Sequence, residues 1–302
     1  MRGLILTTLL SVSSCAFSNG TDTLLLEKHL KNIVETDAPR KYTNLEVLDQ
    51  VAAYIFDVFE SYADTTYYQE YEAYDQTYRN VISVFGPMDA ETVVIGAHYD
   101  VCGDQDGADD NASGVAGLLE LARQLKGQQL KHRIELVAYT LEEPPFFRSL
   151  LMGSHVHAKS LHDEGRDVYG MFCLEMIGYF DDTKGSQDYP LGILKLFYGR
   201  TGDYITLVNK MHKANFARKF SRKFKRSNMI TTKKFTGPKG LEGVDFSDHL
   251  NYWKYGYSAL MITDTAFYRN KNYHETTDTL ETLDIFRMAK VVDATLISLL
   301  AL

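Results

Sequence analysis

The sequence is short of proline, cysteine and low-complexity tracts. Six prolines and no Gly/Ser-rich stretch in 302 residues give no sign of a flexible linker between domains. Three cysteines, Cys15, Cys102 and Cys173, are too few for a disulfide framework, so buried thiols are the default for the last two. Since 45% of the residues are hydrophobic, the chain can bury a large core. We therefore expect a short leader at residues 1–18 and a single domain at 19–302.

An excess of positive charge is also missing. The formal net charge is −8, which disfavours nucleic acid as a partner. Basic residues are instead concentrated, because between Tyr204 and Leu241 there are eleven Lys or Arg and no Asp or Glu. Such a run is typical of a solvated helix face that pairs with acidic surface nearby. Contact with an anionic envelope surface is the alternative.

The N-terminal apolar segment is too short to span a bilayer. Arg2 precedes an apolar core at Leu4–Leu10, a pattern that predicts a cleaved export signal and a location in the periplasm or cell envelope. The residues Val12-Ser13-Ser14-Cys15 resemble a bacterial lipobox, in which the cysteine becomes the lipidated first residue. Ordinary cleavage near residues 16–18 remains open, and so does a lipid anchor at Cys15.

Strands and helices alternate along the chain. Continuous apolar runs are expected of strands buried on both faces, whereas apolar residues three and four apart predict helices. The predicted strands are at 67–74, 78–85, 93–98, 134–140, 171–177, 193–197 and 258–263. The predicted helices are at 24–34, 45–62, 113–125, 152–162, 246–253 and 281–300. A further, basic helix is expected between the strand at 193–197 and the helix at 246–253. This order predicts an α/β three-layer sandwich, a mostly parallel mixed sheet with antiparallel edges and helices on both faces.

Polar residues follow the predicted buried strands, where sites collect in such sheets. His98 and Asp100 end one strand and point to the same side of it, which suits an imidazole ligand and its orienting carboxylate. Further along comes Gly107-Ala108-Asp109-Asp110-Asn111-Ala112-Ser113-Gly114. Acids before a helix could simply favour its dipole, and Ser113 could cap that helix. Two adjacent acids flanked by glycines exceed what capping needs.

Two further segments supply acids. Glu142 and Glu143 follow the strand at 134–140 and precede Pro144-Pro145, which stiffen the segment. A solvated loop is the alternative explanation for this pair. Glu175 lies between apolar neighbours in a buried strand and so needs a partner.

The last element is a polar loop, Asn272-Tyr273-His274-Glu275-Thr276-Thr277-Asp278-Thr279. A loop histidine is more often a surface residue than a metal ligand. Here His274 would complete a ligand set that is already half assembled.

In this order the motifs resemble those of the co-catalytic di-zinc peptidases, a superfamily that includes bacterial leucyl aminopeptidases, glutamate carboxypeptidase and glutaminyl cyclases. The resemblance covers about residues 80–284 and implies a zinc-peptidase, phosphorylase/hydrolase-like fold. It also implies that Asp109 bridges two metal ions. His98 and Glu175 would complete one site, and Glu143 and His274 the other. Leucyl aminopeptidases usually carry Asp at the Glu175 position, so this chain departs from their pattern there.

The resemblance also implies catalytic roles. Glu142 would be the general base for a metal-activated water, Asp100 would support His98, and the Asp109–Asp110 peptide would be cis. Oxygen and imidazole ligands without thiolate suit two Zn²⁺ per chain, with manganese or cobalt as substitutes. The implied activity is that of a metal-dependent aminopeptidase acting on small peptides.

Two other functions remain as alternatives. A glutaminyl-cyclase-like zinc acyltransferase would need one metal, and the retention of His98 argues against it. A non-catalytic peptidase-like binding domain would be expected to lose ligands. Which peptide end is recognised stays open, because Arg148 could bind a substrate carboxylate or form a structural salt bridge.

Overall fold

The structure is a computed structural model and describes residues 20–211 and 215–302. The predicted leader at 1–18, with Cys15, therefore lies outside the described residues. Within the described part of the chain, no helix is both long enough and apolar enough to cross a membrane.

Eight strands of the described residues form one mixed sheet, in the order β1-β2-β4-β3-β5-β8-β6-β7. The central strands β4, β3, β5 and β8 are mutually parallel. On one side β2 pairs antiparallel with both β4 and β1, and on the other side β6 pairs antiparallel with β8. The last strand, β7, lies parallel to β6. The strands are β1 (Thr65–Ala73), β2 (Gln76–Phe85), β3 (Thr92–His98), β4 (Arg133–Tyr139), β5 (Val168–Glu175), β6 (Ile205–Lys210), β7 (Thr232–Gly237) and β8 (Ala259–Thr263).

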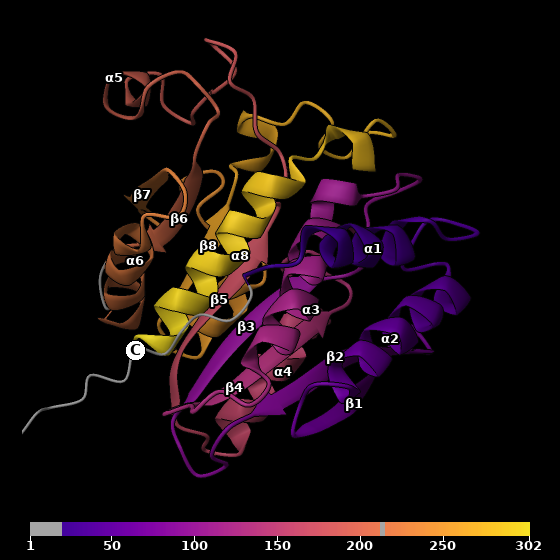
Figure 1. Cartoon of the computed structure of the whole chain (residues 1–302). Helices are drawn as coiled ribbons and strands as arrows, with labels where there is room; N and C mark the ends of the chain where they lie inside the picture. The colour runs from indigo at the N-terminus through magenta and orange to yellow at the C-terminus, as the bar shows by residue number, and fades with distance from the viewer. Residues whose placement is uncertain (1–19, 212–214) are drawn as a thin grey trace, which may run out of the picture.

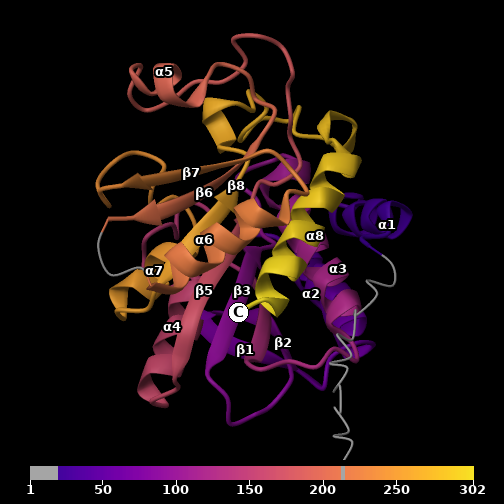
Figure 2. The same cartoon turned by 60° about the vertical axis from the view of Figure 1, so that its left-hand side comes forward.

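Helices lie on both faces of the sheet (Figures 1 and 2). The α-helices are α1 (Thr23–Val34), α2 (Leu45–Glu60), α3 (Gly114–Leu125), α4 (Gly153–Asp163), α5 (Leu194–Tyr198), α6 (Asn215–Ser227), α7 (His249–Lys254) and α8 (Ile285–Leu300). Short irregular turns are η1 (Ala108–Ser113), η2 (Ala266–Tyr268) and η3 (Leu280–Thr282). The predicted α/β sandwich with a mostly parallel centre and antiparallel pairing toward the edges is confirmed.

The two faces of the sheet are covered unequally. Helices α1, α2, α3, α6 and α8 enclose the larger core, whereas α4 and α7 cover the smaller core on the other face. Successive strand residues alternate between these cores, as Val93 and Ile95 face the first and Val94 the second. The central strands are buried on both faces for this reason, which explains their unbroken apolar sequence.

Two local predictions are wrong. The apolar run at 193–197 forms no strand but the short helix α5, with Leu196 and Phe197 exposed, and the sixth strand begins later, at Ile205. Ser113 does not cap α3, because its backbone is helical and its hydroxyl donates to the carbonyl oxygen of Asp109. The other predicted helices and strands are present, with ends shifted by a few residues, whereas the strand β7 was not predicted.

Candidate metal centre

The parallel strands end at one edge of the sheet, and five acid and histidine side chains meet there. They are His98 at the end of β3, Asp110 in η1, Glu143 after β4, Glu175 at the end of β5 and His274 in the loop after β8. Four of the five are buried, and the His274 side chain is partly exposed. Because parallel strands present their carboxyl ends together, residues far apart in the sequence share this edge.

Asp110 lies between the two histidines. Its Oδ1 is 3.4 Å from Nε2 of His98, and its Oδ2 is 3.3 Å from Nε2 of His274. Each imidazole also faces a glutamate: Nε2 of His98 is 3.5 Å from Glu175, and Nε2 of His274 is 3.2 Å from Glu143. The five side chains thus form two half-sites that share one aspartate.

The prediction that Asp109 is the shared residue is wrong by one position. The carboxylate of Asp109 accepts hydrogen bonds from the backbone N–H of Gly178 and from the side-chain amide of Asn270, away from both histidines. Adjacent residues in a turn present their side chains in different directions, so only one of the two aspartates faces the cluster. The non-proline cis peptide is likewise one bond later, at Asp110–Asn111.

Asp100 contacts the glutamate pair as well as His98, the one partner that the sequence predicted for it. Its carboxylate lies 3.6 Å from Nδ1 of His98, and that ring nitrogen also lies 3.2 Å from the Asp100 carbonyl oxygen. The same carboxylate accepts the backbone N–H groups of Glu142 and Glu143, at 3.2 and 3.1 Å. Asp100 therefore fixes both the imidazole and the glutamate pair. Oε2 of Glu142 lies 4.0 Å from Nε2 of His98, at the side of the cluster.

Two supporting residues, Asp278 and Arg40, were missed in the sequence. The Asp278 carboxylate accepts the backbone N–H groups of Asp109 and Asp110, which fixes the turn that aims Asp110. The buried Arg40 donates to four backbone carbonyls, among them those of Asp106 and Gly107 at the start of the same turn. No local pattern could reveal these contacts, because each joins segments far apart in the chain.

Ser247 is a further supporting residue. Its hydroxyl donates to Oε2 of Glu175 at 2.6 Å, so it holds the longer carboxylate that stands where leucyl aminopeptidases usually have aspartate. The sequence Phe246-Ser247-Asp248-His249 resembles bacterial members of the family and favours a supporting or helix-capping role over a ligand role, and the contact of Ser247 with Glu175 agrees with a supporting role. Asp248 is also buried, and burial raises the pKa of its carboxyl group to about 7.

Burial and mutual repulsion shift the pKa values of the acids in this cluster. Burial, together with the charge of Asp110, raises the pKa of Glu143 to about 8, and burial raises that of Glu142 well above its usual range. Burial lowers the pKa of His274, but the carboxylates of Asp110 and Glu143 outweigh it and raise the pKa to about 10. So many like charges in a small volume are costly unless cations neutralise them.

The donor set fits metal ions. One ligand atom each of His98, Asp110 and Glu175 lies within 4.8 Å of the other two, a spacing that a shared cation can occupy. In the second half-site, Oδ2 of Asp110, Oε1 of Glu143 and Nε2 of His274 are buried without a hydrogen-bond partner. Buried polar atoms normally have such partners, so these unpartnered ligand atoms fit a bound cation. Imidazole and carboxylate together suit zinc.

Cys102 lies closer to the cluster than the sequence suggested. One sulfur atom, one oxygen of Glu143 and one ring nitrogen of His274 lie within 4.8 Å of one another. The thiol is partly exposed rather than fully buried, and its partial burial raises its pKa to about 11. A thiol with a raised pKa is mostly protonated at neutral pH and so is a weaker candidate ligand than the carboxylates.

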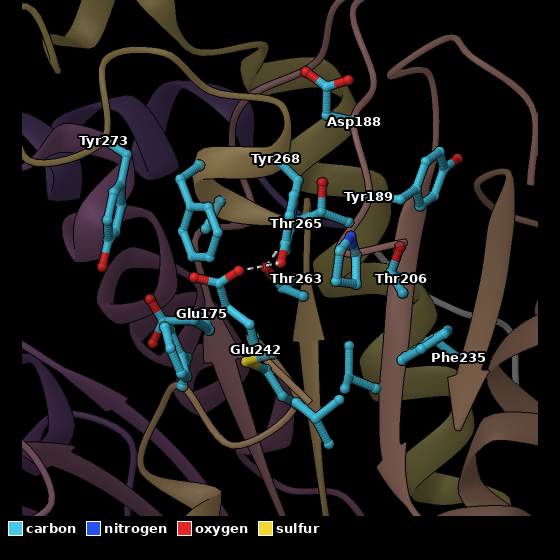
Figure 3. A pocket seen from close by; sticks show the side chains of 18 of the residues that line it. Glu175, Asp188, Tyr189, Thr206, Phe235, Glu242, Thr263, Thr265, Tyr268 and Tyr273 are labelled. Atoms are coloured by element: carbon cyan, nitrogen blue, oxygen red, sulfur yellow. Dashed lines mark hydrogen bonds between the residues drawn. The ribbon is translucent and has the colours of Figure 1, made fainter. Parts of the chain in front are cut away.

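A cavity of about 220 Å³ opens beside the cluster (Figure 3). Its inner end is lined by Asp110, Glu142, Glu143, Glu175 and His274. The Tyr273 ring stacks on the His274 imidazole, with ring centroids 3.8 Å apart, and closes one side. The centre is therefore accessible to a small molecule while most of its ligand atoms are shielded from bulk water.

Fold and site together define a class: an α/β protein with an acid–imidazole centre, fit for metal ions, at the carboxyl edge of its sheet. Residues 80–297 match the model of Peptidase family M28. The chain is 44% identical over 276 residues to "Uncharacterized protein YfbL" of Escherichia coli, covering 89% of this chain and 84% of that protein. It is 27% identical to leucine aminopeptidase 1 of Uncinocarpus reesii, over 72% of this chain, but spans only 53% of that enzyme.

Solved structures agree on the fold. The LapA aminopeptidase of Legionella pneumophila superposes with a TM-score of 0.71 at 19% identity, over 92% of this chain and 71% of that one. A Bacteroides thetaiotaomicron glutaminyl cyclase gives 0.68 at 18% identity, over 93% and 98%. The zinc aminopeptidase of Bacillus subtilis gives 0.58 at 23% identity, over 74% and 50%. The chain belongs to peptidase family M28, and this membership supports a hydrolase.

Proposed function

We propose that this protein is a zinc-dependent aminopeptidase that removes N-terminal residues from small peptides. The observation that carries the proposal is the charge of the cavity. Six of its lining residues are acids, and among the described residues that line it none is Lys or Arg. Three of these acids would hold the metal ions. The carboxylates that remain can attract a free N-terminal ammonium group, whereas the lining offers no Lys or Arg to bind a C-terminal carboxylate.

Two ions would be held by the two half-sites, one by His98, Asp110 and Glu175 and the other by Asp110, Glu143 and His274. When bound, zinc supplies Lewis-acid activation of water and of a carbonyl group. The supporting contacts from Asp100, Ser247 and Asp278 keep the ligand atoms in place, as partners of metal ligands do.

Glu142 is positioned to move the proton. Its carboxylate lines the cavity and lies close enough to His98 and Glu143 to approach a bound ion, but each half-site already has three ligands without it. In the proposed reaction, this carboxylate accepts a proton from the attacking water and passes it to the leaving amine. Burial raises its pKa, which brings the group closer to the range in which it can both accept and release a proton near neutral pH.

Arg148 does not support the carboxypeptidase alternative. Its guanidinium forms an ion pair with Asp245 at 2.6 Å and lies over the rings of Phe147 and Phe246. Arg148 does not line the cavity, so its ion pair is structural and its guanidinium does not face a bound substrate. A glutaminyl-cyclase-like activity shares this fold, but both half-sites are complete here, which favours a two-metal hydrolase.

Hydrolysis assays with zinc restored test the proposal. We expect cleavage of unblocked aminoacyl-anilides, no cleavage of the N-acetylated forms, and loss of activity with a chelator. The Glu142→Gln variant should lose about 10²–10⁴-fold in kcat while its zinc content is unchanged, because it lacks only the proton acceptor.

The matched control is Glu60→Gln, which removes an exposed carboxylate at the end of α2. Equal cleavage of blocked and unblocked substrates would contradict an aminopeptidase. Cyclisation of N-terminal glutaminyl peptides, with a single zinc per chain, would instead establish the cyclase alternative. Stoichiometric zinc with neither activity would leave a binding domain.

We also propose that the chain is exported and tethered by lipid at Cys15. The sequence of the leader supports this proposal, as does the basic composition of the segment that contains α6. Fractionation of a Cys15→Ser variant tests it.

A further inference from the structure

The cavity continues away from the metal centre into a largely apolar compartment. Its walls come from the loop that carries α5, from β6 to β8, and from the loop between β7 and α7 (Figure 3). They are lined by Tyr189, Leu194, Tyr204, Val208, Phe235 and Met261. A substrate whose scissile bond lies at the centre would place its first side chain in this compartment, since that side chain is next to the bond.

One carboxylate interrupts the apolar wall. Glu242 lies on the loop between β7 and α7, and its Oε2 accepts a hydrogen bond from the Tyr268 hydroxyl at 3.1 Å (Figure 3). This contact holds the carboxylate against an aromatic ring in the cavity wall. The Glu242 residue is exposed, so its carboxylate is accessible to solvent and to a ligand.

Glu242 differs from the other acid that lies outside the metal centre. Asp188 also lines the cavity, but it pairs with Lys195 at 2.8 Å and lies 3.7 Å from Lys271. Within residues 20–211 and 215–302, no Lys, Arg or His nitrogen forms an ion pair with Glu242. Arg148 forms its ion pair with Asp245 instead. The cavity therefore presents one uncompensated carboxylate outside the centre.

An aromatic and aliphatic wall with one carboxylate matches the side chain of lysine or arginine. Both have an apolar stem that packs on apolar surface and a cationic end that carboxylates and aromatic faces attract. Resting on the proposed aminopeptidase function, we propose that the enzyme selects peptides with a basic N-terminal residue. Glu242 binds the cationic end of that residue, and Tyr268 positions Glu242.

Paired substrates test this selectivity. We expect a higher kcat/KM for argininyl- and lysyl-anilide than for leucyl-anilide. Glu242→Gln should lower the ratio of argininyl to leucyl kcat/KM on the order of tenfold, the loss typical of one hydrogen-bonded charge pair. Glu242→Lys should lower it further, whereas Glu242→Asp, which keeps the charge, should retain a preference for arginine. Glu60→Gln is the control and should leave the ratio unchanged.

Two outcomes would overturn the inference. An unchanged ratio in Glu242→Gln would show that the carboxylate does not contact the first side chain. An equal loss on all substrates would show that Glu242 binds the N-terminal ammonium group, which every peptide carries.

A binding measurement separates this inference from the proposed function. Calorimetric titration with argininamide and leucinamide needs no turnover, so tighter binding of argininamide that Glu242→Gln removes supports the selectivity even if no anilide is cleaved. Absence of cleavage for every substrate, with that binding intact, would reject the aminopeptidase alone. Equal binding of the two amides would reject the basic preference.

Discussion

At the scale of single residues, the centre depends on which of two adjacent aspartates faces the histidines. The sequence Asp109-Asp110 predicts a carboxylate in this turn but cannot distinguish the two, since both are metal-competent. The choice is made by contacts from distant segments. Asp278 accepts hydrogen bonds from the backbone N–H groups of both residues. The Asp109 carboxylate accepts hydrogen bonds from Gly178 and Asn270 and so faces away from the histidines.

Replacing each aspartate in turn tests this assignment. We expect Asp110→Asn to lose zinc from both half-sites, because it removes the negative charge that lies 3.4 and 3.3 Å from the two imidazoles. Asp109→Asn should weaken zinc binding by no more than about 10–100-fold, as the loss of a supporting partner does. Zinc per chain, measured after dialysis against graded chelator concentrations, distinguishes the two variants. Zinc loss greater in Asp109→Asn than in Asp110→Asn would restore the bridging role to Asp109.

Other residues of the centre could be predicted because strand ends are visible in the sequence. His98 and Glu175 each follow an apolar run, and parallel strands bring such ends together. His274 comes from a loop and was predicted because it would complete a half-assembled ligand set, with the resemblance to a known family as further support. The supporting role of Arg40 could not be predicted. Nothing in the sequence around a single arginine indicates that it is buried beneath a turn about seventy residues further along the chain.

At the scale of helices and strands, prediction depended on periodicity. Short apolar runs do not distinguish a strand from other structure, and the run at 193–197 shows the consequence. It forms α5, of which no residue is buried, at the outer wall of the cavity, and two of its residues line that cavity. The basic helix was easier to predict, because Phe216, Phe220 and Phe224 repeat every four residues and all three are buried.

Helix α6 gives a prediction of stability. The Phe220 ring stacks on Phe172 of β5, with ring centroids 4.4 Å apart, and is fully buried. We expect Phe220→Ala to lower the free energy of unfolding by about 3–5 kcal/mol, because it leaves a cavity between helix and sheet. Lys225→Ala, on the exposed face of the same helix, should change it by no more than about 0.5 kcal/mol. Urea unfolding of both variants checks the difference, and similar midpoints would show that α6 contributes little to the core.

At the scale of the whole molecule, the basic face of α6 stands out against a net charge of −8. Its Arg218, Arg222, Lys225 and Arg226 are exposed, while the aromatic residues of the helix are buried and cannot insert into a bilayer. Such a face could contribute only electrostatic attraction to an anionic membrane, which salt screens.

Lipidation at Cys15 and attraction through α6 therefore make different predictions for fractionated cells. A lipid chain contributes about 0.8 kcal/mol per buried CH₂ group and is insensitive to salt, so wild-type protein should stay in the membrane pellet at about 1 M salt, where the Debye length is only about 3 Å. Cys15→Ser should move to the soluble fraction, and Cys102→Ser, which also removes one thiol, should not. Release of the wild type by salt would leave α6 as its membrane contact, because a covalent anchor does not respond to screening.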